Sequence, residues 1–423
     1  MPRPHRILRA AVPALLIAAL AGCSAEVVPE PADRTVSAPE PTGDGVLTIG
    51  TLLPTSGEAA VLGPAMVAAA ELAARDVDEA GGVGGAPIEL VHRDSGDAAG
   101  DQLETAFGEF VEDGVDVVIG PASSVLVERV LPLAVEAGVA VITPSATAPG
   151  LGALDDDGLL ARTVPSAGLQ GSALAKRLLV EDDDARVALV RQDDELGREL
   201  DERLSLDLEA AGGALVASEP LDDGTEELAA DLAGREPTAV VLATGGDQLE
   251  RTAALATALL AHGVDAEQLW FTAGNLADYG PLVEPGALEG AHGLGIGAQP
   301  GESFVQRLRE VDPAVLGTAF AAETYDAVLL AALAAAMAGD DGGASIATRL
   351  AEASSGGAEC DSADACLEAL ADGRDIDYDG FSGPLDLDAA GESQRGTFGL
   401  HVYDASGAPQ RSGQFVSGKV SAR

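Results

Sequence analysis

The stretch that decides the fold is VDVVIGPASS, residues 115–124, taken together with GVAVITPSATAP, residues 138–149. Each begins with a short apolar run and then passes into small residues, several of which carry hydroxyl groups. Short runs that are apolar throughout are typical of strands buried on both faces, as in parallel sheets. We therefore interpret each stretch as a buried strand that ends in a hydroxyl-rich loop.

An alternation of strand-like and helix-like patterns continues on both sides of these two strands and predicts the fold class. The first series has apolar runs at 88–91, 115–119 and 139–142, with helical patterns at 63–79 and 102–112. The second has apolar runs at 186–190, 214–218, 238–243 and 268–272, with helical patterns at 195–211, 225–233 and 247–262. Such alternation predicts parallel sheets covered by helices on both faces. Because the rhythm breaks near residues 162–168, we expect an α/β fold with two doubly wound parallel-sheet lobes.

The hydroxyl-rich loops are candidate binding elements. In open parallel sheets, ligands bind beyond the carboxyl ends of the strands, and N–H groups at the following helix starts can receive an anion. We therefore expect Ser123, Ser124, Ser145 and Thr147 to bind an anionic group such as a carboxylate. The alternative is that these residues are only helix caps, which favour Ser and Thr.

Composition narrows the class of protein. The net charge is −46, from 70 acidic and 24 basic residues, whereas nucleic-acid binding needs Lys and Arg to neutralise phosphates. The sequence has no phosphate-binding GxxxxGK[ST] loop, no HExxH zinc motif and no GxSxG nucleophile elbow. We expect no nucleic-acid partner, no cofactor and no enzymatic activity.

The amino terminus has the features of a secretory signal. Three arginines precede an apolar stretch at residues 10–20, which is too short to span a membrane as an ordinary helix. Leu-Ala-Gly-Cys follows and ends at Cys23. This ending resembles the bacterial lipobox, in which the cysteine is lipid-modified; the alternative is a plain signal peptide with a chance cysteine. We predict a lipoprotein signal peptide over 1–22, a lipid anchor at Cys23 and, because it is Pro-rich, a disordered tether over 23–45.

Two further features concern the carboxyl-terminal third. Cys360 and Cys366 are close in sequence, and neighbouring cysteines in an exported protein usually form a disulfide, which we predict here. An acidic stretch also matches positions one, three, five, six and twelve of a calcium loop, with Asp375, Asp377, Asp379, Gly380 and Asp386. Position twelve is Asp rather than Glu, and a proline leads into an expected strand where a helix would follow. These departures favour an acidic turn over a calcium loop, and we expect no metal site.

Several segments, taken in order, resemble the leucine/isoleucine/valine-binding proteins, which are extracytoplasmic solute receptors of ABC importers with the type I periplasmic-binding fold. The segments are VLTIGTLLPTSGEAAVLG, VVIGPASS, VAVITPSATAP, RTVPSAGLQG and DYDGFSGPLDLDAAGE, within residues 46–403. The resemblance implies two lobes joined by three crossings, with a ligand trapped between them. The crossings would lie near Thr163–Pro165, Gly297–Pro300 and Gly396–Phe398. Lobe 1 would comprise 46–163 and 298–396, and lobe 2 would comprise 164–297 and 397–423.

The resemblance also implies site residues. The family's carboxylate-binding positions match Ser124, Ser145, Ala146 and Thr147. Where aromatic side chains usually flank the ligand, this sequence has Leu62, Leu196 and Asp247. The acidic partner of the ligand amine would lie near Gly274 or Asn275, neither of which is acidic, so Asp247 or Asp278 would have to replace it.

These features together predict a non-enzymatic, monomeric solute-binding protein that feeds an ABC permease from the outer face of the cell membrane. Its ligand would be a small amino acid or a related carboxylate or amide. The alternative is a ligand-sensing module of the same fold that reports to a membrane signalling partner.

Overall fold

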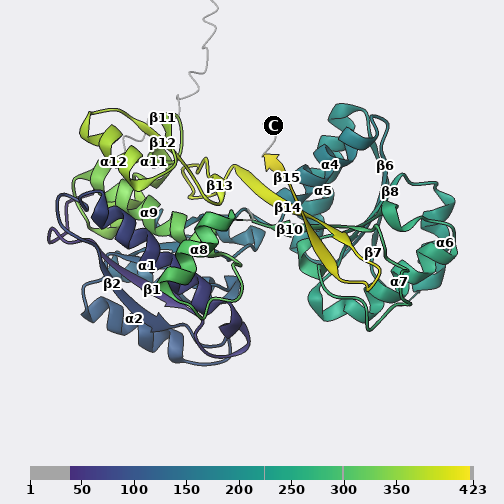
Figure 1. Ribbon diagram of the computed structural model, residues 1–423, viewed down its shortest axis with the longest axis horizontal. Coiled ribbons are helices and arrows are strands. Elements are labelled where there is room, and N and C mark those ends of the chain that lie inside the picture. The colour runs from purple at the N-terminus through teal and green to yellow at the C-terminus, as the bar shows by residue number, and fades with distance from the viewer. Residues whose placement is uncertain (1–38, 223, 298–299, 420–423) are drawn as a thin grey trace, which may run out of the picture. The chain divides into compact units, whose positions relative to one another are not determined.

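The computed structural model describes residues 39–222, 224–297 and 300–419 (Figure 1). The predicted signal peptide, the anchor residue Cys23 and the first part of the predicted tether lie outside the described residues. The described end of the tether contacts the folded body, because Gly43 donates its N–H to Asp340 at 3.0 Å and Gly45 donates to Asp341 at 3.0 Å. These contacts fix where the chain enters the first lobe.

The first lobe contains a five-stranded parallel sheet in the order β2-β1-β3-β4-β5. Its strands are β1 (Thr48–Leu53), β2 (Glu89–Asp94), β3 (Val117–Ile119), β4 (Ala140–Thr143) and β5 (Leu160–Arg162). The helices of this lobe are α1 (Gly63–Glu79), α2 (Gln102–Glu112), α3 (Ser124–Ala137), α8 (Glu302–Val311), α9 (Ala321–Ala338), α10 (Gly343–Ala347), α11 (Leu350–Ala353) and α12 (Ala363–Ala371).

The central strands of this sheet are mostly apolar because each face packs against a separate core. In β3, Val117 and Ile119 belong to the core formed with α1 and α9, whereas Val118 belongs to the core formed with α2 and α3. Successive side chains of a strand point to opposite faces, so both faces require apolar residues. The helix α9 is apolar and long enough to cross a membrane, but most of it is buried in the core of the lobe.

The second lobe contains a seven-stranded mixed sheet in the order β15-β14-β10-β9-β8-β6-β7. Its strands are β6 (Arg186–Arg191), β7 (Ala214–Pro220), β8 (Ala239–Ala243), β9 (Leu269–Phe271), β10 (His292–Ile296), β14 (Arg395–Tyr403) and β15 (Pro409–Lys419). The helices α4 (Leu169–Glu181), α5 (Glu195–Ala211), α6 (Thr225–Gly234) and α7 (Leu249–Ala261) also belong to this lobe.

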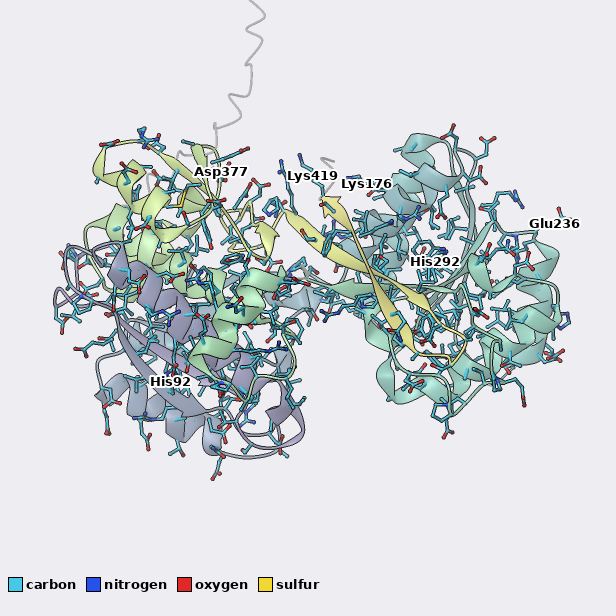
Figure 2. All side chains as sticks on the ribbon, in the orientation of Figure 1. His92, Lys176, Glu236, His292, Asp377 and Lys419 are labelled. Atoms are coloured by element: carbon cyan, nitrogen blue, oxygen red, sulfur yellow. A yellow bond between two sulfur atoms is a disulfide. The ribbon has the colours of Figure 1, made fainter. Side chains whose placement is uncertain are left out.

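Five of these strands are parallel; β6, β7, β8 and β9 match the predicted apolar runs, whereas β10 was not predicted, and β14 and β15 form an antiparallel pair at one edge. Strand β14 is antiparallel to β10 because the chain returns beside the end of β10 and runs back along it, and the turn at 404–408 then reverses the chain into β15. The chain's two lysines lie on this edge, Lys176 on α4 and Lys419 at the end of β15 (Figure 2). Lys176 contacts the carbonyl oxygen of Ser417 on β15 at 3.5 Å.

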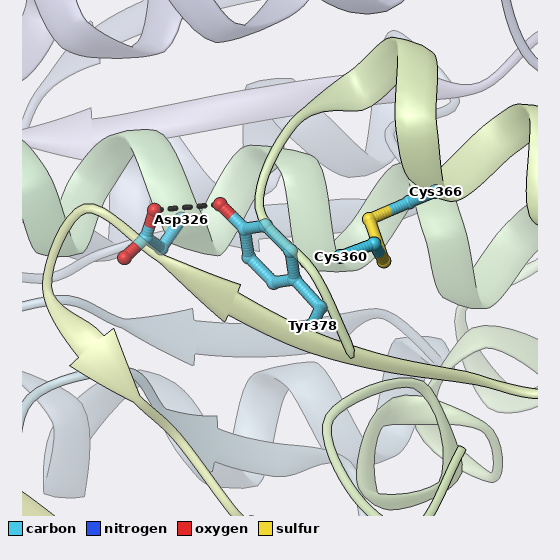
Figure 3. The surroundings of a disulfide bond; sticks show 4 residues. All are labelled: Asp326, Cys360, Cys366 and Tyr378. Carbon is cyan, nitrogen blue, oxygen red and sulfur yellow. Dashed lines mark hydrogen bonds between the residues drawn. A yellow bond between two sulfur atoms is a disulfide. The ribbon is translucent and has the colours of Figure 1, made fainter. Parts of the chain in front are cut away.

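A small third sheet carries the predicted disulfide. It contains β11 (Ala358–Cys360), β12 (Ile376–Gly380) and β13 (Gly383–Pro384). The Sγ atoms of Cys360 and Cys366 are bonded, with 5.4 Å between the Cα atoms, and the bond joins the end of β11 to α12 (Figure 3). The disulfide expected from the sequence is therefore present.

The acidic stretch at 375–386 is a pair of strands and not a calcium loop. Positions two to six of the supposed loop form β12, and the chain then turns into β13. The turn is held by Asp326 of α9, which accepts a hydrogen bond from the Tyr378 hydroxyl at 2.7 Å (Figure 3). Asp326 also accepts the N–H of Ser382 at 2.7 Å. In the part of the chain that the structure describes, no group of three or more His, Cys, Asp or Glu side chains is arranged to hold a metal ion.

The three predicted crossings contact one another. Gly297 donates its N–H to the carbonyl oxygen of Thr397 at 3.0 Å, which pairs the second crossing with the third. The third also packs on the first, since a β-carbon at Gly396 would lie 2.5 Å from Pro165. Thr163 in the first crossing donates its hydroxyl to the carbonyl oxygen of Glu323 at 2.7 Å.

Candidate ligand-binding site

The two hydroxyl-rich loops lie side by side in the first lobe. Strands β3 and β4 are adjacent and parallel, with Ile119 opposite Ile142, so their carboxyl ends meet at the same edge of the sheet. Gly120 continues this pairing by donating its N–H to Ile142 at 2.9 Å. Its φ is +114°, and a β-carbon there would lie 2.3 Å from the carbonyl oxygen of Leu52. Glycine is therefore required for the first loop to leave the sheet at this point.

Buried hydroxyl groups join the loops to each other. Thr143 donates to the carbonyl oxygen of Pro121 at 2.7 Å and accepts the N–H of Ala146 at 3.2 Å. Ser145 donates to the carbonyl oxygen of Ala122 at 3.0 Å. The hydroxyl proton of Ser145 and the N–H of Ala146 are therefore used within the protein, and both side chains are buried. These two predicted residues shape the site rather than offering those donors to a ligand.

Ser124 is bonded differently. It is the first residue of α3, and its hydroxyl oxygen accepts the N–H of Ala148 at 3.1 Å. An N-cap residue would instead accept from N–H groups in the first turn of its own helix, and Ser123, which occupies the N-cap position, makes no such side-chain bond. Ser124 is therefore not a helix cap, whereas Ser123 holds the cap position without making the side-chain hydrogen bond of a cap.

Three hydroxyl donors therefore remain at the edge of this site. Ser124 accepts the N–H of Ala148 and donates to no described residue, and the half-buried Ser123 and Thr147 hydroxyls have no hydrogen bond to any described residue. The first turn of α3 contains no acidic residue, so the partial positive charge at the start of this helix is not offset there. This arrangement can receive a carboxylate.

The remaining predicted residues follow strands at their carboxyl ends. Leu62 lies between β1 and α1, Leu196 is in the first turn of α5 after β6, and Asp247 is in a 3₁₀ turn (Gly246–Gln248) after β8. The two leucines are half-buried and the Asp247 side chain is exposed. Asp247 is thus the acidic group among them that lies at a strand end of the second lobe.

The second lobe rules out the two other positions considered for an amine partner. Asn275 is buried, and its amide group donates to the carbonyl oxygen of Leu242 and the hydroxyl of Thr244, both at 2.8 Å. Asp278 accepts the N–H of Gly280 in a turn beside the loop between β14 and β15, near the amino end of β10. The suggestion that Asp278 replaces the acidic partner is wrong, because it lies at the opposite end of the sheet from the strand ends.

An arginine that the sequence did not single out contacts the second loop. Arg162 is the last residue of β5, its side chain is 2% exposed, and it donates from Nη1 to the carbonyl oxygen of Ala148 at 3.0 Å. It also forms an ion pair with Glu392. Burial raises the pKa of the Glu392 carboxyl above its usual value, while Arg162 opposes this shift.

Comparison with known proteins decides the family. Residues 46–399 match the family described as periplasmic binding protein. The chain belongs to this family. The match includes both loops, the crossings and the disulfide-bearing segment, and it confirms the resemblance inferred from the sequence motifs.

This periplasmic binding protein aligns with about half the length of the curated relatives that it matches. The Leu/Ile/Val-binding protein BraC3 of Rhizobium johnstonii is 29% identical over 192 residues, which is 45% of this chain and 51% of that protein. The leucine-, isoleucine-, valine-, threonine- and alanine-binding protein of Pseudomonas aeruginosa is 28% identical over 175 residues, which is 41% of this chain and 46% of that protein.

Solved structures share the fold of this periplasmic binding protein over nearly their whole length. A putative branched-chain amino acid ABC transporter protein from Rhodospirillum rubrum has a TM-score of 0.65 at 23% identity, covering 88% of this chain and 99% of that one. A Streptococcus pneumoniae substrate-binding protein in complex with isoleucine has a TM-score of 0.60 at 21% identity, covering 89% and 100%. An R. palustris solute-binding protein in complex with benzoate has a TM-score of 0.57 at 21% identity, covering 89% and 98%.

The sequence of this periplasmic binding protein did not predict the contact between Arg162 and Glu392. The two residues are separated by 230 positions, so no local motif connects them. The available signal was a charged residue at the end of an apolar strand, where burial requires a partner.

Proposed function

We propose that this chain is the solute-binding protein of an ABC importer and binds a small amino acid or a related carboxylate between its two lobes. The observation that carries the proposal is the pairing of the two loops in the first lobe. The Ser124 hydroxyl accepts the N–H of Ala148 and donates to no described residue, and the Ser123 and Thr147 hydroxyls have no described partner. These hydroxyl donors and the amino end of α3 are thus left for an anion.

The charge of the chain supports a carboxylate at this place. With 70 acidic residues, most helix starts have an Asp or Glu nearby, and such a group would repel an anionic ligand. The first turn of α3 has none. Hydrogen bonds to a charged group contribute about 1.5–3 kcal/mol each, which is enough for two hydroxyl donors to determine whether a small ligand binds.

The names of the relatives support the same ligand class. Curated relatives are named for binding leucine, isoleucine and valine, and structural neighbours hold isoleucine or benzoate. A carboxylate is common to these ligands, whereas an amine is not. We propose that Asp247 pairs with the amine if the ligand has one, because it is exposed at the carboxyl end of β8.

The cellular setting follows from the same proposal. A lipid on Cys23 would hold the protein at the outer face of the cell membrane, with the residues before the folded body as a tether. Ligand binding would stabilise a closed arrangement of the lobes, which the permease would recognise. The proposed protein acts as a monomer and carries out no chemical step.

The test is a calorimetric panel on the purified folded body. It compares L-leucine, L-isoleucine, L-alanine, benzoate and 4-hydroxybenzoate, with L-leucinamide and benzamide as matched compounds that lack the carboxylate. We expect at least one acid to bind and its amide to bind at least tenfold more weakly. Equal binding of an acid and its amide, or no binding by any acid, would contradict the proposal.

A further inference from the structure

The peptide group between Thr147 and Ala148 is held on both sides. Its N–H donates to the Ser124 hydroxyl oxygen at 3.1 Å, and its carbonyl oxygen accepts the N–H of Ala167 at 3.0 Å. A hydroxyl oxygen that accepts one hydrogen bond has its own proton directed elsewhere. The position of Ala148 therefore determines the direction in which Ser124 can donate.

Arg162 holds Ala148 from the other side. Its Nη1 donates to the Ala148 carbonyl oxygen at 3.0 Å, and its own backbone N–H donates to the carbonyl oxygen of Gly391 at 3.0 Å. The guanidinium is planar and its donors have a fixed geometry, so it fixes the groups that it contacts more tightly than a flexible ammonium would. A buried arginine at the end of β5 thus holds the residue that orients Ser124.

Glu392 keeps the guanidinium in place. It forms the ion pair with Arg162, and its side chain is 20% exposed. Two glycines make room for this contact: a β-carbon at Gly152 would lie 2.8 Å from the Glu392 carboxyl carbon, and one at Gly391 would lie 2.1 Å from the Leu160 carbonyl oxygen. The segment around Glu392 is therefore fitted closely against β5 and the end of the second loop.

The same loop is tied to the first crossing. Thr163 donates its N–H to the carbonyl oxygen of Thr143 at 3.3 Å, and Ala167 donates to Thr147 as described above. Arg162 directly precedes this crossing. The loop that contains Thr147 and the chain that leaves the first lobe are consequently one hydrogen-bonded unit, with Arg162 at their junction.

We propose that Arg162, held by Glu392, is a positioning residue for ligand binding: it fixes Ala148 and thereby directs the Ser124 hydroxyl towards the ligand carboxylate. The inference rests on the proposed function, because it needs a carboxylate at Ser124. It adds a second layer of residues that contact no ligand but set the affinity for it.

The experiment is a double-mutant cycle between Arg162→Gln and Ser124→Ala, read by calorimetry with L-leucine and benzoate as probes. Arg162→Gln should weaken binding about tenfold. In the Ser124→Ala background the same substitution should weaken binding less than threefold further, because the hydroxyl that it orients is gone. Arg162→Lys should recover part of the affinity, since one ammonium reaches Glu392 or the Ala148 carbonyl but does not match both.

Arg129→Gln is the matched control. Arg129 pairs with Glu104 at 2.7 Å and donates to the carbonyl oxygens of Ala98 and Gly100, both at 2.6 Å, so it makes the same kinds of contact elsewhere in the first lobe. Its loss should leave the affinity unchanged. Glu392→Gln tests the same proposal if Arg162→Gln does not fold, because glutamine keeps an acceptor for the Arg162 guanidinium. It should weaken ligand binding by a smaller factor than Arg162→Gln does.

A readout without ligand completes the design. Hydrogen exchange of the Ala148 amide should accelerate at least tenfold in Arg162→Gln or Glu392→Gln and stay unchanged in Arg129→Gln. The positioning role would be overturned by any one of three results. These are additive losses of affinity in the double-mutant cycle, unchanged affinity in a folded Arg162 variant, and unchanged hydrogen exchange of the Ala148 amide. If Ser124→Ala alone has no effect on affinity, the proposed carboxylate site fails instead, and the exchange data still decide whether Arg162 holds Ala148.

Discussion

Ala148 donates its backbone N–H to the hydroxyl oxygen of Ser124 at 3.1 Å, which connects the loop after β4 to the first residue of α3. This bond makes Ser124 an acceptor inside the protein, and its hydroxyl donates to no described residue. Ser145 is the opposite case, since its proton is already given to the carbonyl oxygen of Ala122. Two serines that each follow one of these adjacent strands therefore differ in which hydrogen bonds they make.

Thr147→Val should separate ligand binding from stability. The Thr147 hydroxyl has no hydrogen bond to a described residue, so its loss should leave the apo melting temperature nearly unchanged and weaken carboxylate binding about tenfold. Thr143→Val is the matched control: its buried hydroxyl makes two hydrogen bonds, and its loss should lower the melting temperature. Calorimetry and thermal melts on both variants check this. The same affinity for Thr147→Val and wild type would contradict the role given to this hydroxyl.

Asp116 should make stability depend on pH. Burial, together with the nearby Asp341, Asp44 and Asp340 carboxylates, raises the pKa of its carboxyl to about 7, although the N–H that Asp116 accepts from Thr48 at 2.9 Å lowers it. The folded state therefore binds a proton below pH 7 that the unfolded chain binds only near pH 4. This group stabilises the fold as the pH falls from 7 towards 4, and its charged form is unfavourable above pH 7.

Asp116→Asn should accordingly raise the melting temperature relative to wild type at pH 8, and this gain should shrink by pH 5. Thermal melts at the two pH values measure it. Asp155→Asn, at an exposed position, is the control for removing one negative charge from a strongly acidic protein. A gain for Asp116→Asn that is the same at both pH values would contradict the assignment.

The disulfide should stabilise the first lobe without affecting the site. Its loop is short, so replacing Cys360 and Cys366 by serine should cost about 2 kcal/mol of unfolding free energy on the loop-entropy account. Denaturant unfolding of the double variant, compared with reduced and oxidised wild type, gives the value. Ligand affinity should stay the same; a weaker affinity would mean that this segment is coupled to the site.

Cys23→Ser should release the protein from the membrane. The proposal places a lipid on this cysteine, and the apolar helix α9 is largely buried in the core. Fractionation of cells expressing the variant, with Cys360→Ser as the control, measures the effect. Retention of the Cys23 variant in washed membranes would show that another element anchors the chain.

Much of the fold could be predicted because both faces of the central strands are buried. The strands containing Val117 and Ile142 are mostly apolar for that reason, and they lie where the sequence placed them. The pair β14–β15 was not foreseen. Most of β15 is exposed at the sheet edge, so its sequence PQRSGQFVSGK has no continuous apolar run.

The candidate site could be predicted only for residues that directly follow a predicted strand, because the strand fixes where they lie. Ser124 and Thr147 follow adjacent parallel strands, so their proximity follows from the strand pattern. The contact of Arg162 with Glu392 depends on the return of a distant segment, and the role of Asp278 depends on a turn that caps a backbone N–H. The first leaves no local pattern; the second is a bond between residues two positions apart, so an Asp-X-Gly turn was the signal that could have been recognised.

The most direct test of the central claim is the affinity of Ser124→Ala for the acid that binds tightest in the panel, measured by calorimetry beside its amide. We predict at least a tenfold loss for the acid and little change for the amide, because the hydroxyl donates to the carboxylate. Some loss of apo stability is also expected, since Ala148 loses its acceptor. An unchanged affinity for the acid in a folded Ser124→Ala protein would contradict the account.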